Sequence, residues 1–332
     1  MNNFKKIGMT ALAASLVATS AFAGELAVSG SASIKTAHTT TALGANTGKA
    51  FSMGNSVTFT GGGELDNGLN VSVSFELDQA QANNAAVTAS GVVAADSGAV
   101  FDSHSVTVSS DALGSLTFAG HGGDSAQSAV KDMTGKIWDY QGTSQKAVAS
   151  SSSNNMMLYT LPSVIDGVSV SASYVPKGAA ATQWASATDV AIAYTGVEGL
   201  TVGYALGEKN ATEATVGDVD TWYAKYAYGP VTVAYTETEF ASKADASDRE
   251  FEAMSVAYAV SENISVSYGT SENTQNTTAA SSTNQPEEVS GITASYTMGG
   301  MTLSGAMIDV KNQAFVKGTK EEAWELALAF AF

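Results

Sequence analysis

Residues 323–332 alternate between large apolar side chains and smaller or charged ones. Successive side chains of a β-strand point to opposite faces, so a period of two predicts a strand with one strongly apolar face. A face this apolar must lie against a protein core or a lipid phase. The apolar parity consists of Trp324, Leu326, Leu328, Phe330 and Phe332.

The same alternation recurs along the chain, for example at Val231, Val233 and Tyr235. A soluble sandwich would carry Lys and Glu on its polar face, but here Ser, Thr, Gly and Ala dominate that face. Only 14% of the residues are charged, against about 25% in ordinary soluble domains. The pattern predicts sixteen strands, at residues 25–35, 50–62, 69–79, 102–110, 114–122, 154–162, 167–176, 188–197, 199–207, 218–228, 230–240, 249–260, 263–271, 287–298, 301–311 and 321–332.

The connections between these strands alternate in length. The short ones contain hairpin signals such as Asn67-Gly68 and Asp166-Gly167. The long ones are rich in Ser, Thr, Asn, Ala and Asp and are expected to be solvated loops, at residues 36–49, 80–101, 123–153, 177–187, 208–217, 241–248, 272–286 and 312–320. This alternation is typical of an up-and-down barrel with short turns at one rim and long loops at the other. The predicted fold class is all-β, a transmembrane antiparallel up-and-down β-barrel of about 16 strands.

Residues 1–23 have the organisation of a secretory signal peptide. Lys5 and Lys6 precede an apolar stretch that ends in Ala21 and Ala23, an A-x-A cleavage site. The mature chain is expected to be a single barrel domain over residues 24–332. No run of about 18 apolar residues follows the cleavage site, so any crossing of a membrane must be made by strands. The chain has no cysteine, so its stability in an export compartment cannot come from disulfides.

These features together resemble the general porins of the Gram-negative outer membrane, a family of trimeric 16-stranded channels. The resemblance covers the whole mature chain. It implies a homotrimer in the outer membrane, in contact with lipid and lipopolysaccharide. It also implies that the barrel assembly machinery reads the C-terminal strand through Trp324, Leu326, Leu328, Phe330 and Phe332.

In that family the third long loop folds into the lumen and narrows it. The counterpart here is the loop of about residues 123–153, which also contains Ile137 and Lys146. The family sets loop acids against a ladder of arginines, whereas this chain has a single arginine, Arg249. An outward solvated loop is the alternative. The candidate constriction residues are Asp124, Lys131, Asp132, Lys136, Trp138, Asp139 and Tyr140.

Charge limits the partners of the chain and suggests an ion preference. Acids outnumber bases 32 to 15, which disfavours nucleic acid as a partner and predicts a weak cation preference for the channel. The charges of the third loop balance, so the preference is expected to be mild. Charged side chains at the strand positions of the small polar face would tune this ion preference if they lined the lumen; the alternative is that they lie solvated at a rim. The lumen-wall candidates are Lys35, Glu76, His121, Lys225 and Glu325.

Other polar and aromatic residues carry weaker signals. His38, His104 and His121 show neither metal-ligand spacing nor a Ser-His-Asp pattern, so we predict no metal centre and no enzyme activity. Calcium bound by the acidic pairs Asp245-Asp248 and Glu287-Glu288 and bridging to lipopolysaccharide is the alternative to simple solvated charge. Tyrosines on the apolar parity are expected to form an aromatic girdle at the outer interface: Tyr174, Tyr194, Tyr204, Tyr235, Tyr258 and Tyr268.

The sequence therefore favours a water-filled outer-membrane channel for passive diffusion of small hydrophilic solutes and ions. A substrate-specific channel, for example for sugars, would need a track of lumen aromatics, for which Tyr223, Trp138 and Tyr140 are the candidates. A barrel enzyme built around His104 and His121, and a secreted β-rich surface protein, are further alternatives.

Overall fold

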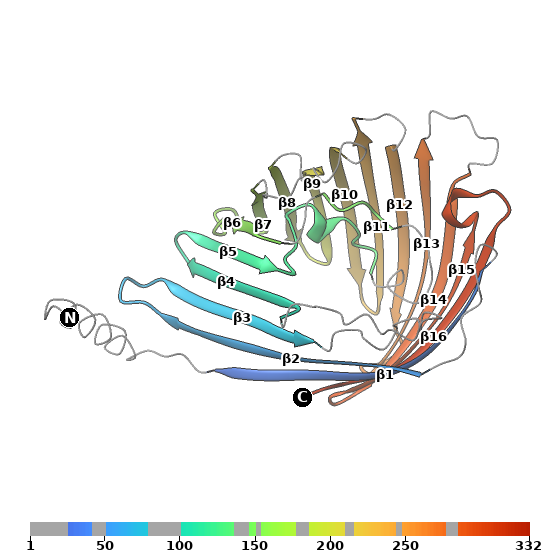
Figure 1. Cartoon of the computed structure of the whole chain (residues 1–332), viewed down its shortest axis with the longest axis horizontal. Coiled ribbons are helices and arrows are strands. Elements are labelled where there is room, and N and C mark those ends of the chain that lie inside the picture. The colour runs from blue at the N-terminus through green and yellow to red at the C-terminus, as the bar shows by residue number, and fades with distance from the viewer. Residues whose placement is uncertain are drawn as a thin grey trace, which may run out of the picture.

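The computed structural model describes residues 26–41, 51–78, 101–135, 146–150, 154–176, 186–209, 216–243, 248–276 and 285–332. Sixteen antiparallel strands form one closed barrel in which each strand pairs with its neighbours along the chain and β1 pairs with β16 (Figure 1). The predicted fold class is confirmed. The signal peptide predicted at residues 1–23 lies outside the described residues. Among those that are described, no helix is long and apolar enough to cross a membrane.

The strand boundaries agree closely with the predicted ones, with two exceptions. β1 continues to Thr41 and β13 to Asn276, where loops were predicted from residues 36 and 272. Both extensions stay in register with a neighbouring strand, because polar residues pair as well as apolar ones once the sheet is set. The strands are β1 (Ala27–Thr41), β2 (Phe51–Glu64), β3 (Asn70–Asp78), β4 (Ser103–Ser110), β5 (Gly114–His121), β6 (Met156–Thr160), β7 (Val168–Val175), β8 (Ala187–Val197), β9 (Leu200–Lys209), β10 (Gly217–Tyr228), β11 (Val231–Ser242), β12 (Asp248–Ala259), β13 (Ile264–Asn276), β14 (Glu287–Met298), β15 (Met301–Lys311) and β16 (Lys320–Ala331).

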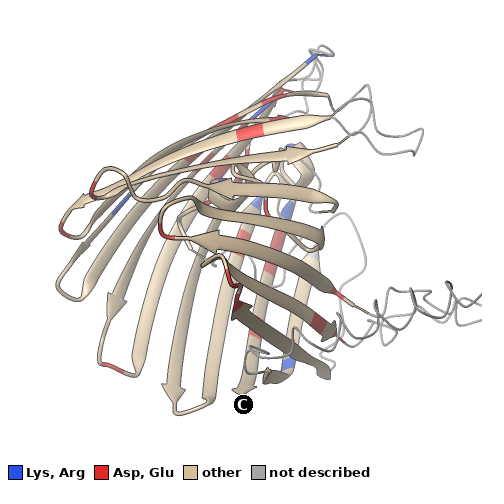
Figure 2. Ribbon diagram, turned by 90° about the vertical axis from the view of Figure 1, so that its left-hand side faces the viewer, with Lys and Arg blue, Asp and Glu red and all other residues tan. Residues whose placement is uncertain are grey.

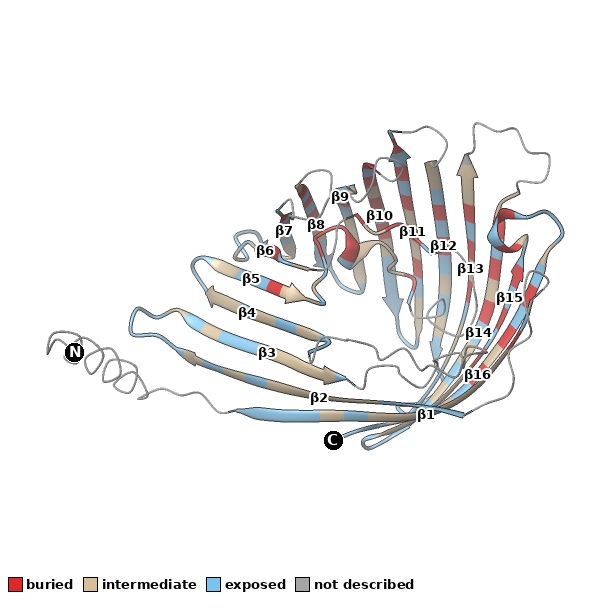
Figure 3. Ribbon diagram, in the orientation of Figure 1, coloured by how far each residue is buried: buried red, intermediate tan, exposed pale blue. Residues whose placement is uncertain are grey.

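The two faces of the sheet differ as the alternation requires. On β10, Val219, Thr221 and Tyr223 point inward and are buried, whereas Trp222 and Tyr226 are exposed on the outer wall. Figure 3 shows the resulting bands of buried and exposed residues along β8, β10 and β11. Closure of the sheet pairs the strand backbones with one another, which is what a lipid phase demands of a spanning structure.

The C-terminal residue extends the seam between the first and last strands, which pair from Ser31 with Ala331 to Thr41 with Glu321. The Gly30 amide donates to the Phe332 carbonyl at 2.7 Å, and the Phe332 amide donates to the Gly30 carbonyl at 3.0 Å. A Cβ atom at position 30 would lie 2.6 Å from the Phe332 ring, so the ring lies directly over this glycine. The other residues of the predicted assembly signal face outward along β16, with Leu326 and Phe330 exposed.

The tyrosine girdle is placed differently from the prediction. Tyr258 pairs with Val231, the first residue after a short turn, and Tyr194 pairs with Val168, which also follows a short turn. These two tyrosines therefore lie near the short-turn rim, and the prediction of an outer-interface position was wrong for them. The reason is strand direction: β8 and β12 run toward the short turns and end there. Tyr174, Tyr204 and Tyr268 are exposed on the outer wall further from that rim.

Candidate functional site

The described parts of the third long loop, residues 122–135 and 146–150, lie against the inner wall of the barrel; we call them the inner loop. Figure 1 shows them inside the curve of the sheet, between β5 and β11. The inner loop begins where β5 ends at His121 and contains one short 3-10 turn, Ser128–Val130. Its hydrogen-bond partners are inward-facing residues of β7, β8 and β10 to β13.

Gln127 joins the two limbs of the inner loop to β10. Its side chain is fully buried, and Nε2 donates to Thr221 Oγ1 at 2.9 Å and to the Val148 carbonyl at 3.3 Å. Its Oε1 accepts from the Ser150 amide at 2.8 Å. One amide group thus holds the outgoing limb, the returning limb and the wall together.

A chain of buried hydroxyls ends on a buried carboxylate beside this amide. Ser125 Oγ lies 2.9 Å from Ser150 Oγ, which donates to Asp189 Oδ2 at 2.5 Å. Asp189 is 1% exposed and its Oδ1 also accepts from the Glu208 amide. Because a buried charge is tolerated only when it is hydrogen-bonded, Asp189 fixes the position of Ser150 against β8.

Wall hydroxyls bind the backbone of the inner loop further along. Thr236 Oγ1 on β11 accepts from the Met133 amide at 2.9 Å. Two others donate to loop carbonyls: Thr238 to Lys131 at 2.7 Å and Ser255 to Thr134 at 2.5 Å. These bonds satisfy loop backbone groups that would otherwise be buried without partners.

The returning limb is held mainly by apolar contacts. Val148 packs with Val219 and Phe240. Ala147 packs into an inward-facing apolar cluster that includes Phe251 and Val310. The apolar side chains of this limb are therefore buried against the wall, and detachment of the limb would expose them to water.

Two of the charged residues predicted in this loop, Lys131 and Asp132, make hydrogen bonds within it. Asp124 is exposed. Lys131 Nζ donates to the Ser128 carbonyl at 3.1 Å, and Asp132 Oδ1 accepts from the Thr134 amide and hydroxyl at 2.9 and 2.5 Å. The carbonyl of Lys146 accepts from Asn273 at 3.4 Å. The remaining candidates lie outside the described residues: Lys136, Ile137, Trp138, Asp139 and Tyr140.

Known proteins match this chain at two levels, that of a family model and that of solved structures. A family model described as "Gram-negative porin" matches residues 8–286. The chain belongs to the Gram-negative porin family. It is accordingly an outer-membrane β-barrel channel. Comparison with curated protein sequences gives no match.

Solved porins share the fold at low sequence identity. An anion-selective porin from Comamonas acidovorans is 14% identical, with a TM-score of 0.69 over 93% of this chain and 100% of that one. A mutant of Rh. blastica porin is 14% identical at a TM-score of 0.66, over the same shares of both chains. A porin structure refined at 1.8 Å is 18% identical, again at a TM-score of 0.66 and with the same coverage.

The lumen-wall candidates of this porin are spread over several strands. Lys35 Nζ lies 3.4 Å from Glu325 Oε2, an ion pair between β1 and β16. Glu76 Oε2 accepts from Ser103 Oγ at 3.3 Å. Lys225 is exposed on the inward parity of β10. His121 contacts the Asp102 carbonyl where β5 ends.

A second group of inward-facing charges lies near the long loops; Arg249 and Lys209 were not predicted as site residues, whereas Glu287 was a calcium candidate. The Arg249 guanidinium lies 5.5 Å from the Phe315 ring centroid, and Lys209 Nζ lies 5.9 Å from that of Phe240. Glu287 is fully buried and accepts from the Ala314 amide at 2.7 Å. Parity could have found these residues, because each continues the small polar face of its strand.

The acid excess of the chain lies mostly on the outer wall. These acids occupy outward-facing positions of their strands, between the apolar residues and the long loops. Figure 2 shows acidic positions recurring on neighbouring strands. On the described inner wall the acids outnumber the bases seven to four, with Glu64, Glu76, Asp78, Asp189, Glu287, Glu321 and Glu325 against Lys35, Lys209, Lys225 and Arg249. The inner wall therefore keeps only a small acid excess, because most of the strand acids lie on the outer wall. The outward acids are Glu208, Asp218, Asp220, Glu237, Glu239, Glu250, Glu252, Glu272, Glu288, Asp309 and Glu322.

The weaker candidates lie on several strands. His38 pairs with Trp324 on the outer wall, and His104 pairs with Phe75 on β3 and with His121 on β5. Glu287 and Glu288 are neighbours on a strand and point to opposite faces, and Glu288 binds Lys311 at 3.0 Å. Asp248 accepts from the Ser242 amide at 2.7 Å, and Asp245 lies outside the described residues. Among the described strands, the inward aromatics Tyr223, Phe240 and Phe251 are all buried, so they offer no sliding track for sugars.

Proposed function

We propose that this porin passes small hydrophilic solutes and ions by passive diffusion, and that the inner loop sets the width of its lumen. The observation that carries the proposal is the anchoring of this loop along β7 to β13 through Gln127, Asp189 and wall hydroxyls. A sixteen-stranded barrel is wide enough to leave an aqueous channel, and a loop fixed against one wall narrows it permanently. No step of covalent chemistry is required.

The absence of native cysteine permits a direct test of the loop's place in the current path. Ala129 is exposed beside the buried Ser128. In planar bilayers, a bulky thiol reagent is expected to lower the single-channel conductance of Ala129→Cys in discrete steps, because it adds volume inside the lumen. Asp309→Cys, exposed on the outer wall, is the control and should react without a change in current. Equal conductance of labelled and unlabelled Ala129→Cys would contradict the proposal.

We further propose that the lumen discriminates weakly by charge. The reversal potential under a potassium chloride gradient is expected to be small and of cation-selective sign for the wild type, because inward acids outnumber inward bases seven to four on the described strands. Lys225→Glu should move it toward cation selectivity, since this side chain is exposed on the inner wall. Glu252→Gln should leave it unchanged, because its carboxylate lies outside the barrel and is screened within about 8 Å at physiological salt. A shift caused by Glu252→Gln would show that outer charges govern selectivity.

The remaining parts of the proposal rest on the family resemblance. They are a homotrimer, cleavage of residues 1–23 on export and recognition of the C-terminal strand by the assembly machinery. Conductance steps that occur in threes and a mature N-terminus at Gly24 are the expected observations.

A further inference from the structure

A groove on the outer wall of the barrel, across β9 to β15, changes from apolar to acidic along its length. Its apolar part has a volume of about 600 Å³ and is lined by residues such as Leu200, Val233 and Val256. Its acidic part has a volume of about 390 Å³ and is lined by residues such as Glu252, Glu272 and Lys311. The two parts share Tyr235, Met254, Tyr268 and Thr270, so they form one continuous groove.

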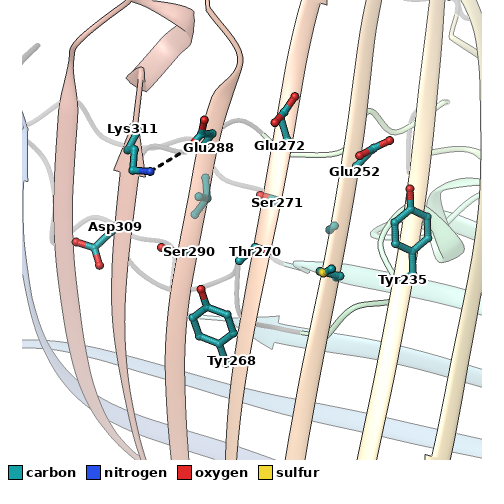
Figure 4. A pocket seen from close by; sticks show the side chains of 13 residues that line it. Tyr235, Glu252, Tyr268, Thr270, Ser271, Glu272, Glu288, Ser290, Asp309 and Lys311 are labelled. Atoms are coloured by element: carbon teal, nitrogen blue, oxygen red, sulfur yellow. Dashed lines mark hydrogen bonds and ion pairs between the residues drawn. The ribbon is translucent and has the colours of Figure 1, made fainter.

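Two tyrosines mark the boundary between the two parts. Figure 4 shows Tyr235 and Tyr268 with their hydroxyls directed toward the row of carboxylates and their rings on the apolar side. The Tyr235 hydroxyl donates to Glu237 Oε2 at 3.0 Å. Tyrosine takes this orientation where an apolar phase meets a polar one. The small side chains of Thr270 and Ser290 lie between the larger ones and keep the groove open.

The strand register aligns the carboxylates of the acidic part. Glu237 pairs with Glu252, Glu252 with Glu272, and Glu272 with Glu288. Like charges directly opposite one another across strands repel. Lys311, which binds Glu288 at 3.0 Å, offsets only the last member of the row (Figure 4). The acidic part of the groove is therefore complementary to a cationic group.

We propose that this groove binds one membrane lipid that carries an ammonium headgroup. The acyl chain lies along Met254 and Val256, and the ammonium donates hydrogen bonds to Glu252 and Glu272. An acyl chain fits because this wall of a membrane barrel faces lipid, and an ammonium fits because it has three donors and a positive charge. The inference rests on the barrel's place in a membrane and not on conduction through the lumen.

Native mass spectrometry of the full-length protein tests the site. The protein is delipidated and then equilibrated with micelles that contain equal amounts of phosphatidylethanolamine and phosphatidylglycerol. The wild type is expected to retain phosphatidylethanolamine in preference, and Glu252→Gln/Glu272→Gln should weaken that retention about tenfold, since two charge-assisted contacts are lost. Thr270→Trp fills the groove and should abolish retention of both lipids. Glu322→Gln, an outward acid on β16 outside the groove, is the matched control.

Three results would overturn the proposal. One is equal retention of both lipids by the wild type and the double variant, which would indicate unspecific contact with the wall. Another is retention of phosphatidylglycerol that requires Mg²⁺ and is lost with a chelator, which would assign a phosphate lipid bridged by divalent ions. The third is retention unchanged by Thr270→Trp. Circular dichroism verifies the folding of each variant, so failure of the channel proposal in bilayers leaves this test intact.

Discussion

Gln127→Ala is expected to detach the inner loop from the wall while the barrel stays folded. The substitution leaves the Val148 carbonyl and the Ser150 amide without this partner in a buried site, whereas the Thr221 hydroxyl keeps its contact with the Thr238 hydroxyl at 2.8 Å. Each unpaired buried group costs about 1–3 kcal/mol. A loss of about 3 kcal/mol in local stability raises the population of the detached loop by about two orders of magnitude.

Limited proteolysis and bilayer recording measure this effect. Gln127→Ala should be cleaved faster between strands β5 and β6 and should show larger fluctuations of the open-channel current. Thr297→Ala removes another hydroxyl pair, Thr297 with Thr302 at 3.0 Å, which does not touch the inner loop, and it should behave as the wild type. A wild-type cleavage rate for Gln127→Ala would mean that other contacts hold the loop.

The partner of Gln127 allows a check on the mechanism. Thr221→Ala removes the hydroxyl that accepts from Gln127 Nε2 and should produce part of the same effect. Because the two residues form one contact, the double variant is expected to be less than additive. Additive effects would indicate that each side chain holds the loop independently.

The barrel could be predicted from sequence because successive side chains of a strand alternate between a lipid-facing and a lumen-facing side. The alternation around Tyr235 and along residues 323–332 indicates which face of the strand is apolar. Turn sequences such as Asp166-Gly167 indicate where the chain reverses. Together these two local signals determine the number of strands and the closed up-and-down topology. The ends of strands were harder to predict, as at Thr41 and Asn276, because residues that pair beyond the apolar band show no hydrophobic alternation.

The anchors of the inner loop could not be predicted in the same way. Gln127 lies in a segment without periodicity, and its partner Thr221 is 94 positions away on β10. Asp189 gave a usable signal, an acid on the small polar face of β8, but nothing local identifies Ser150 as its partner.

The placement of the acids shows what net charge leaves out. Extending the apolar parity of β11 beyond Tyr235 leads to Glu237 and Glu239, so the pattern itself assigns them to the outer wall. The total charge of the chain carries no such information. A barrel wall separates an aqueous lumen from a lipid environment, and only the parity of each residue tells on which side its charge acts.

Phe332→Ala is expected to lower the amount of assembled protein in the outer membrane strongly while leaving refolding in detergent nearly intact. The backbone bonds that close the seam, between residues 332 and 30 and along the pairing of β1 with β16, survive this substitution. The ring is 76% exposed, so its packing over Gly30 contributes little to the free energy of unfolding. A large loss in cells must therefore come from recognition of the aromatic terminus.

The two readouts separate structure from recognition. Membrane fractionation measures assembly in cells, and the shift in electrophoretic mobility on heating measures refolding of purified protein. Phe51→Ala removes an outward aromatic ring that is 80% exposed on β2 and should change neither readout. If Phe332→Ala also fails to refold in detergent, the ring is needed for closure of the seam itself. If it assembles normally in cells, the terminal aromatic is not what the assembly machinery reads in this porin.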